Sequence, residues 1–174
     1  VNAGVSRPLA ASKVKVSDIA LELEDIFHSR LQQKEQNFTL TGGGDLAVVT
    51  HRAALCNSVL SNILSNAMKF SDRSATIEMN ATREGEFVRI EILDQGKGFP
   101  EHLLDQISRG ERYASHPGTE EEGGLGYGLR IAAMYVQRLH GTLDIRNVEE
   151  GGATVAILLP AAGEHDHWLD THSR

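Results

Sequence analysis

The amino-acid sequence predicts an α+β domain in which three main helices pack on one face of a mixed β-sheet of about five strands. Two observations support this prediction. Three segments carry apolar residues at helical spacing, and several short runs alternate apolar and polar residues as strands do. The strand-like runs mostly lie next to each other in the chain, which favours hairpins. With 174 residues, of which 40% are hydrophobic, the chain is long enough to bury one core.

The order of these elements divides the chain into a linker (1–12), a folded domain (13–160) and a polar C-terminal tail (161–174). The predicted helices cover residues 17–33, with Ser17 as N-cap, 51–70 and 126–139. Short strands are expected at 38–40 and 46–49, around a glycine turn, and hairpins at 75–82 with 86–94 and at 142–147 with 153–159. Residues 95–125 form a long irregular stretch, which in a compact domain is usually functional or disordered.

The composition excludes several classes of protein. A net charge of −7 argues against nucleic-acid binding. The single cysteine, Cys56, cannot form an intramolecular disulfide and fits a reducing compartment. No apolar run is long enough to span a membrane and no signal peptide is recognisable, so we expect this domain to make no membrane contact. The chain begins with Val1 and not with methionine, and we therefore expect a fragment of a longer protein.

The first chemical motif is a polar stripe on the predicted helix 51–70. On a helical wheel with Asn62 at zero, Asn66 falls near 40° and Lys69 near 340°, beside the arc of apolar residues. At the edge of a cleft, the two amide oxygens can bind a hard cation, and the ammonium group can contact phosphate. The alternative interpretation is a set of polar residues at a helix boundary.

The second motif, ILDQGKGF (92–99), ends a predicted strand. Asp94 has the same parity as Ile90 and Ile92, so its carboxylate points to the core side and needs a donor there. Gly96 and Gly98 remove side chains where the chain turns, so another group can approach the backbone. A strand-end aspartate followed by a simple glycine turn is the alternative.

The third motif, GGLGYGLRIA (123–132), places three glycines before an amphipathic helix. Such a helix start presents backbone N–H groups to anions. No Gly-Lys-Ser/Thr follows, so this is not a Walker A loop, and the long preceding loop does not fit a dinucleotide fingerprint.

The three motifs in this order, N-x-x-x-N-A-x-K-F, D-x-G-x-G-F and G-x-G-x-G-L, resemble those of the catalytic and ATP-binding (HATPase) domain of bacterial two-component sensor histidine kinases. That domain belongs to the gyrase, heat-shock chaperone, histidine kinase and MutL ATPase superfamily. The resemblance covers residues 13–160. It implies the Bergerat fold, a two-layer α/β sandwich, with ATP and Mg²⁺ as ligands.

The resemblance also implies roles for individual residues. Asn66 is expected to coordinate Mg²⁺ at the phosphates of ATP, with Asn62 and Lys69 beside the phosphates as catalytic residues. Asp94 is expected to accept a hydrogen bond from the adenine amine, assisted by Thr154. Further expected nucleotide contacts are Phe70, Gly96, Gly98, Phe99, Gly124, Leu125, Gly126, Tyr127, Gly128 and Leu129. Residues 100–123 match the family's mobile lid, in which Arg109 is the expected phosphate contact.

The implied activity is transfer of the γ-phosphoryl group of Mg-ATP to a histidine on a separate dimerisation hairpin, for signalling to a response regulator. This sequence has no recognisable acceptor motif: only His165, in the tail, precedes an acidic residue, and His28 precedes a serine. A cytoplasmic location is implied, either free or as part of a membrane-anchored sensor. The alternatives are an anti-sigma-factor-type serine kinase, an ATP hydrolase, which would need a glutamate in place of Asn62, and a non-enzymatic module for protein contact.

Overall fold

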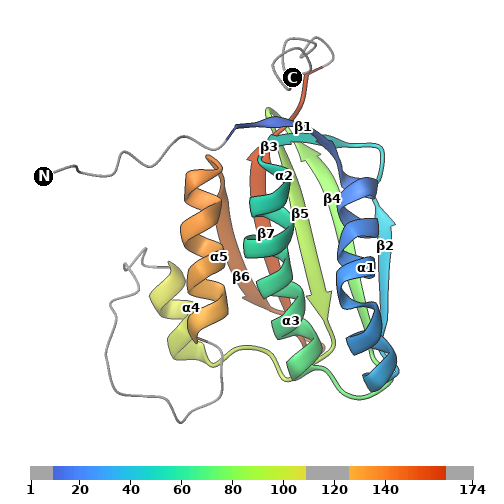
Figure 1. The fold of residues 1–174 in the computed structure, drawn as a ribbon. Helices are drawn as coiled ribbons and strands as arrows, with labels where there is room; N and C mark the ends of the chain where they lie inside the picture. Colours follow the sequence, from blue (N-terminus) through green and yellow to red (C-terminus); the bar gives the residue numbers. More distant parts are fainter. Residues whose placement is uncertain (1–9, 109–125, 164–174) are drawn as a thin grey trace, which may run out of the picture.

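The structure is a computed structural model that describes residues 10–108 and 126–163. In chain order its elements are β1 (Ser12–Lys15), α1 (Val16–Lys34), β2 (Asn37–Gly42), β3 (Ala47–Thr50), α2 (Arg52–Ala54), the π-helical segment η1 (Leu55–Leu60), α3 (Ser61–Phe70), β4 (Thr76–Glu84), β5 (Phe87–Asp94), α4 (Glu101–Ser108), α5 (Gly126–Arg138), β6 (Thr142–Asn147) and β7 (Ala153–Pro160). Figure 1 shows their arrangement.

The main sheet has five strands in the order β2-β4-β5-β7-β6. β2 runs parallel to β4, and the other neighbours are antiparallel, so the sheet is mixed as predicted. The two predicted hairpins are present as β4–β5 and β6–β7. Because β5 and β7 are neighbours at the centre of the sheet, the end of β5 lies beside the start of β7, with Asp94 opposite Ala153.

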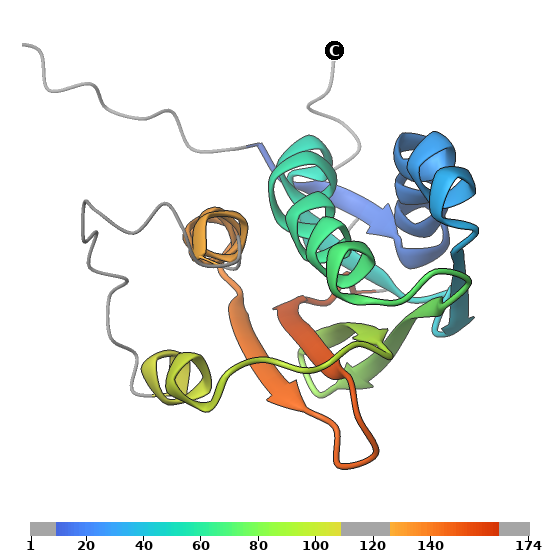
Figure 2. The same cartoon turned by 90° about the horizontal axis from the view of Figure 1, so that it is seen from below.

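The helices α1, α3 and α5 cover one face of the sheet, and the short helix α4 lies beside the edge strand β6 (Figure 2). The core fills the space between these layers with side chains that are less than 2% exposed, among them Leu23, Leu64 and Leu129 from the helices and Ile77, Ile90 and Met79 from the strands. The predicted α+β class and two-layer sandwich are therefore confirmed. Within the described ranges no helix is long and apolar enough to cross a membrane.

The two short strands beside the glycine turn each have a sheet partner that the sequence did not indicate. The runs expected at 38–40 and 46–49 are strands, but they do not pair with each other: β2 pairs with β4, and β3 pairs with β1. β1 begins at Ser12, inside the stretch predicted to be a linker. The parallel β2–β4 pairing joins segments separated by β3, α2, η1 and α3, and local sequence patterns do not reveal such a pairing. β1 was missed because only Val14 of its four residues is buried.

The first helix begins one residue before the prediction. Its N-cap is Lys15, which makes no side-chain capping bond, and not Ser17. The N–H groups of Val16 and Ser17 donate instead to the carbonyls of Leu46 (2.9 Å) and Gly44 (3.1 Å). Carbonyl groups of the loop between β2 and β3 thus satisfy the first N–H groups of α1, and no side-chain cap is needed.

Helical structure also departs from the prediction at two later places. The stretch 95–125, predicted to be irregular, contains helix α4. The predicted helix 51–70 is divided by η1, where both the N–H and the hydroxyl of Ser61 donate to the Cys56 carbonyl. A π-helical turn inside an α-helix is uncommon and often lies at a functional site. Here it directly precedes the helix that carries Asn62 and Asn66.

Candidate functional site

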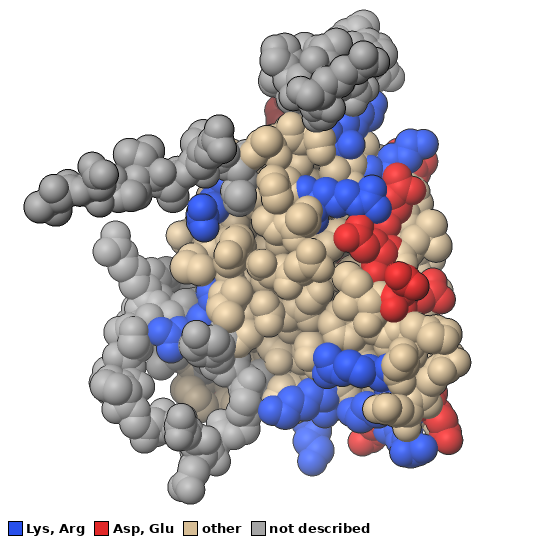
Figure 3. All heavy atoms as spheres, in the orientation of Figure 1, with Lys and Arg blue, Asp and Glu red and all other residues tan. Residues whose placement is uncertain are grey.

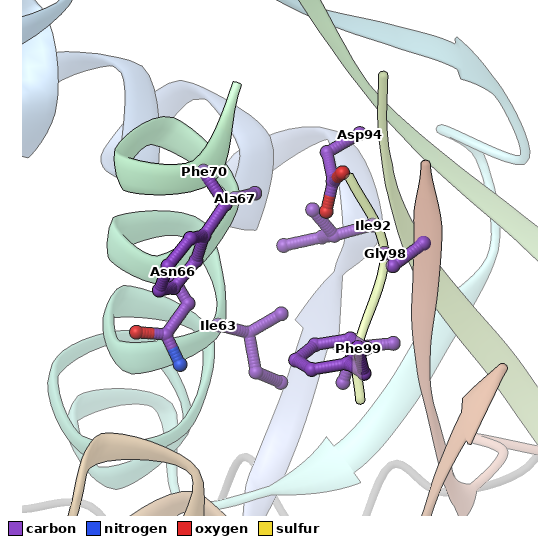
Figure 4. Close-up of a pocket in the computed structure, with 10 residues that line it drawn as sticks. Ile63, Asn66, Ala67, Phe70, Ile92, Asp94, Gly98 and Phe99 are labelled. Carbon is purple, nitrogen blue, oxygen red and sulfur yellow. The ribbon is translucent and has the colours of Figure 1, made fainter. Parts of the chain in front are cut away.

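A pocket lies between α3 and the ends of the central strands β5 and β7 (Figure 4). Its walls come from α3, from the end of β5 and the turn that follows it, and from the start of β7. The lining residues are Ile63, Asn66, Ala67, Phe70, Ile92, Asp94, Gly98, Phe99, Ala153 and Val155. The pocket therefore brings together residues of the first and second motifs, which are separated by β4 and most of β5 in the chain.

Helix α3 supplies one wall of the pocket because its apolar face turns toward the sheet. Ile63 and Ala67 are buried on this face, and Asn66, next to them, is only 8% exposed. The Asn66 side-chain nitrogen is buried and makes no hydrogen bond within the described residues. A buried amide without a partner is costly, so this position favours a polar ligand in the pocket.

Asp94 is the charged group of the pocket, and its carboxylate points into the space between α3 and the strands (Figure 4). Burial raises the pKa of Asp94 above its usual value, while backbone hydrogen bonds from Gly96 and Ala153 lower the pKa in part. The Gly96 N–H donates to Oδ1 at 2.9 Å. The carboxylate is therefore held in one orientation beside apolar walls, where it can accept a hydrogen bond from a ligand.

The glycines of the second motif allow the protein to pack closely against itself. A Cβ on Gly96 would lie 2.4 Å from the Phe70 carbonyl oxygen at the end of α3. Gly98 has a φ of +78°, and a Cβ there would lie 2.8 Å from Oδ1 of Asn147. The groups that approach these two glycines are thus part of this chain, although Gly98 also lines the pocket.

Asn62 lies on α3 one turn before Asn66 and outside the pocket lining. Its side-chain nitrogen donates to the Ser58 carbonyl of the preceding segment η1 at 2.7 Å. A Cβ on Gly128, near the start of α5, would lie 3.1 Å from the Asn62 side-chain oxygen. The first and third motifs therefore meet at this point, as expected if both contact one ligand.

Lys69 is exposed, with its ammonium nitrogen 5.4 Å from the centre of the Phe70 ring. Lys69 and Lys34 lie in the last turns of α3 and α1. Figure 3 shows Lys and Arg side chains gathered at this lower end of the molecule. Such cations complement the negative helix C-termini and also favour anions at this end of the pocket.

The third motif is only partly within the described residues. Arg109, Gly124 and Leu125 lie outside them, as does most of the predicted lid (100–123). Gly126 and Tyr127 form the first turn of α5, which begins where the motif predicted a helix. Leu129 is 1% exposed and belongs to the core, so its packing fixes α5 on the sheet.

Thr154 does not line the pocket, and its predicted place beside Asp94 is taken by Ala153. Ala153 and Val155 line the pocket from β7, and Thr154 lies between them. Alternate side chains of a strand point to opposite faces, so Thr154 lies on the face away from the helices, paired with Leu93 and Arg146. The alternation along β7 could have identified Ala153 from the sequence.

Solved structures share this fold. The catalytic domain of the histidine kinase ThkA aligns with a TM-score of 0.71 and 20% identity over 86% of this chain and 95% of that one. The full-length histidine kinase ShkA, solved in complex with AMPPNP, aligns with a TM-score of 0.72 and 19% identity over 91% of this chain and 32% of that one. The architecture is therefore that of histidine kinase catalytic domains, which confirms the predicted Bergerat fold.

The profile of the histidine kinase-, DNA gyrase B- and HSP90-like ATPase family matches residues 50–163, and the chain belongs to this family. Similar proteins of Escherichia coli (strain K12) are the sensor protein CreC, 30% identical over 82% of this chain, and the sensor protein KdpD, 31% identical over 80% of it. The chain spans 30% of the length of CreC and 16% of that of KdpD. The predicted resemblance to sensor kinases is confirmed.

Proposed function

We propose that this chain is the ATP-binding catalytic domain of a sensor histidine kinase and that the pocket beside α3 binds the adenine of ATP. The observation that carries the proposal is the Asp94 carboxylate, held by the backbone in a pocket whose other walls are largely apolar. Adenine has apolar faces and an exocyclic amine that donates hydrogen bonds. The side chains of Ile63, Ile92 and Val155 can pack against the faces of adenine, and the Asp94 carboxylate can accept a hydrogen bond from its amine.

The phosphates of ATP would lie toward Asn66, Asn62 and the start of α5. The side-chain nitrogen of Asn66 is buried at the pocket wall and makes no hydrogen bond within the described residues. Asn62, one turn before Asn66 on α3, faces Gly128 of α5. An amide oxygen is a suitable ligand for Mg²⁺, which would neutralise phosphate charge when bound. We therefore assign Asn66 as the residue that holds the metal ion and Asn62 and Lys69 as groups beside the phosphates.

The proposed reaction moves the γ-phosphoryl group of ATP to an imidazole nitrogen of a histidine on a separate hairpin, and a response regulator then receives it. The names of CreC and KdpD as sensor proteins support this direction. Hydrolysis is disfavoured, because activation of water needs a base and the neutral amide of Asn62 is not one. Because ATP and response regulators are found inside cells, a cytoplasmic location follows from the same proposal.

Titration of the chain with ATP and with GTP tests the nucleotide part of the proposal. Adenine presents an amine to Asp94, whereas guanine presents a carbonyl oxygen at the same ring position, which the carboxylate repels. We expect calorimetry to give saturable ATP binding and at least about tenfold weaker GTP binding, as for a lost charge-assisted hydrogen bond. Equal affinities, or no binding of either nucleotide, would contradict the proposed adenine site.

A further inference from the structure

Asn147, the last residue of β6, makes two hydrogen bonds to the backbone of one pocket residue. The Phe99 N–H donates to Oδ1 of Asn147 at 2.7 Å, and Nδ2 of Asn147 donates to the Phe99 carbonyl at 2.8 Å. The side-chain amide thus pairs with Phe99 as a second peptide group would in a β-bridge. Asn147 has the same parity as Ile145, which is buried on the helix-facing side of the sheet.

The residues around this pair connect it directly to the nucleotide pocket. Phe99 and the preceding Gly98 line the pocket, and Phe99 is only 8% exposed. Asn147 is the sheet partner of Ala153, and Ala153 is the sheet partner of Asp94. One side chain therefore links the turn after β5 to the end of β6, which is paired with the part of β7 that lines the pocket.

The turn between Asp94 and Phe99 depends on such side-chain bonds because it belongs to no helix or strand. At its start, Asp94 accepts a hydrogen bond from Gly96. At its end, Asn147 holds both polar backbone groups of Phe99. The proposed adenine contact involves Asp94 and not Asn147. The two hydrogen bonds between Asn147 and Phe99 can therefore hold the pocket wall whether or not a nucleotide is bound.

We propose that Asn147 is a positioning residue of the nucleotide pocket, which fixes Gly98 and Phe99 so that the wall opposite α3 is formed before ATP binds. The proposal rests on the proposed function, since it deepens the account of the same site. An asparagine suits this task because its amide both donates and accepts. The same contact explains Gly98, because any Cβ there would lie 2.8 Å from the Asn147 oxygen.

The test compares three variants of the full chain. Asn147→Ala removes both hydrogen bonds. Asn147→Asp keeps an acceptor for the Phe99 N–H and loses the donor to the Phe99 carbonyl. Arg146→Ala is the matched control, since Arg146 is the adjacent residue but forms ion pairs with Glu91 and Asp144 on the other face of the sheet.

Two quantities are measured for each variant: the hydrogen-exchange rate of the Phe99 amide without nucleotide, by NMR, and the Kd for ATP, by calorimetry. For Asn147→Ala we expect the Phe99 amide to exchange at least about tenfold faster and the Kd to rise about tenfold, the scale of losing one or two modest hydrogen bonds. Asn147→Asp should retain most of the Phe99 protection and show a smaller rise in Kd. Arg146→Ala should change neither quantity.

If Asn147 only stabilised the fold, Asn147→Ala would lower stability without this combination of faster Phe99 exchange and weaker ATP binding. An unchanged ATP Kd in Asn147→Ala, with a Phe99 amide that exchanges freely, would overturn the positioning role and leave the proposed function intact. If Asn147→Ala does not fold, Asn147→Asp decides: a Kd equal to that of the wild type would overturn the role. A wild-type chain that binds no ATP would refute the proposed function itself and the positioning role with it.

Discussion

Gly128 of α5 packs against Asn62 of α3 so closely that a Cβ on the glycine would lie 3.1 Å from the asparagine oxygen. Asn62 has little freedom to move away, because its nitrogen is bonded to the Ser58 carbonyl at 2.7 Å. This contact joins two motifs that are more than 60 residues apart in the sequence. It places the start of α5 beside the polar edge of α3, where the phosphates of ATP are proposed to bind.

Substitution of Gly128 by alanine should separate stability from nucleotide binding. Alanine is favoured over glycine in a helix by about 1 kcal/mol, which offsets the crowding of Asn62 in the fold. We expect an unchanged or slightly higher melting temperature but an ATP affinity reduced about threefold to tenfold, because Asn62 and the helix start are displaced. Calorimetry and thermal unfolding measure the two effects. Met134→Ala, on the exposed side of α5, is the control and should leave ATP affinity unchanged; an unaltered affinity in Gly128→Ala would argue against Asn62 as a phosphate neighbour.

Asp94→Asn should weaken ATP binding and stabilise the empty protein. Loss of a charge-assisted hydrogen bond to adenine costs about 1.5–3 kcal/mol, or about tenfold to a hundredfold in Kd. In the empty protein, burial raises the pKa of Asp94, so the folded chain binds a proton more tightly than the unfolded chain. The stability that this proton gives is present below the unfolded pKa and is lost as the pH rises through the folded pKa.

Urea unfolding of the wild type and of Asp94→Asn, as a function of pH, measures this effect. The unfolding free energy of Asp94→Asn, relative to that of the wild type, should increase as the pH rises from below the ordinary aspartate pKa to neutrality. Asp144→Asn, on the far face of the sheet, is the control for ATP affinity. A variant that binds ATP as tightly as the wild type would remove Asp94 from the adenine site.

Gly96→Ala should distort the end of α3 where it meets the turn after β5. The added Cβ would lie 2.4 Å from the Phe70 carbonyl oxygen, a backbone atom that cannot rotate away. Overpacking of this kind costs about 1–3 kcal/mol of stability, and here it also moves Phe70 at the pocket. Denaturant unfolding and ATP titration should both show a loss. In Gly85→Ala the added Cβ meets nothing within 4 Å, so this variant shows only the strain of a positive φ and should keep the ATP affinity of the wild type. Wild-type ATP affinity and stability in Gly96→Ala would refute the packing argument.

Cys56 should resist thiol reagents in the folded protein. Its side chain is fully buried, and burial raises the pKa of the thiol to about 12, so very little reactive thiolate is present at pH 8. The modification rate with a disulfide reagent should follow unfolding and rise steeply across the urea transition. Rapid modification in buffer without urea would mean that η1 opens locally. That result would contradict stable packing of α5 on this segment.

The sequence predicted much of the site because its motifs lie on elements with clear periodicity. The parity of the residues before Asp94 placed its carboxylate on the core side, and the spacing of Asn62 and Asn66 placed both at one edge of the helix. Thr154 was expected beside Asp94 from its place in the motif, but the alternation along β7 turns Ala153 and Val155 toward the pocket instead. Asn147 was missed because a side chain that bonds the backbone of a residue 48 positions away leaves no local pattern. Parallel pairing of β2 with β4 was missed for the same reason.

Phosphoryl transfer from γ-labelled ATP tests the central proposal most directly. The chain is incubated with Mg²⁺ and labelled ATP, first alone and then with a dimerisation hairpin from the same full-length protein, and label on the hairpin and free phosphate are both quantified. The kinase account predicts slow phosphate release by the chain alone and label on the hairpin histidine when the hairpin is added, with none on a hairpin in which that histidine is replaced by alanine. Rapid phosphate release by the chain alone, with no label on the hairpin, would contradict it and indicate an ATP hydrolase.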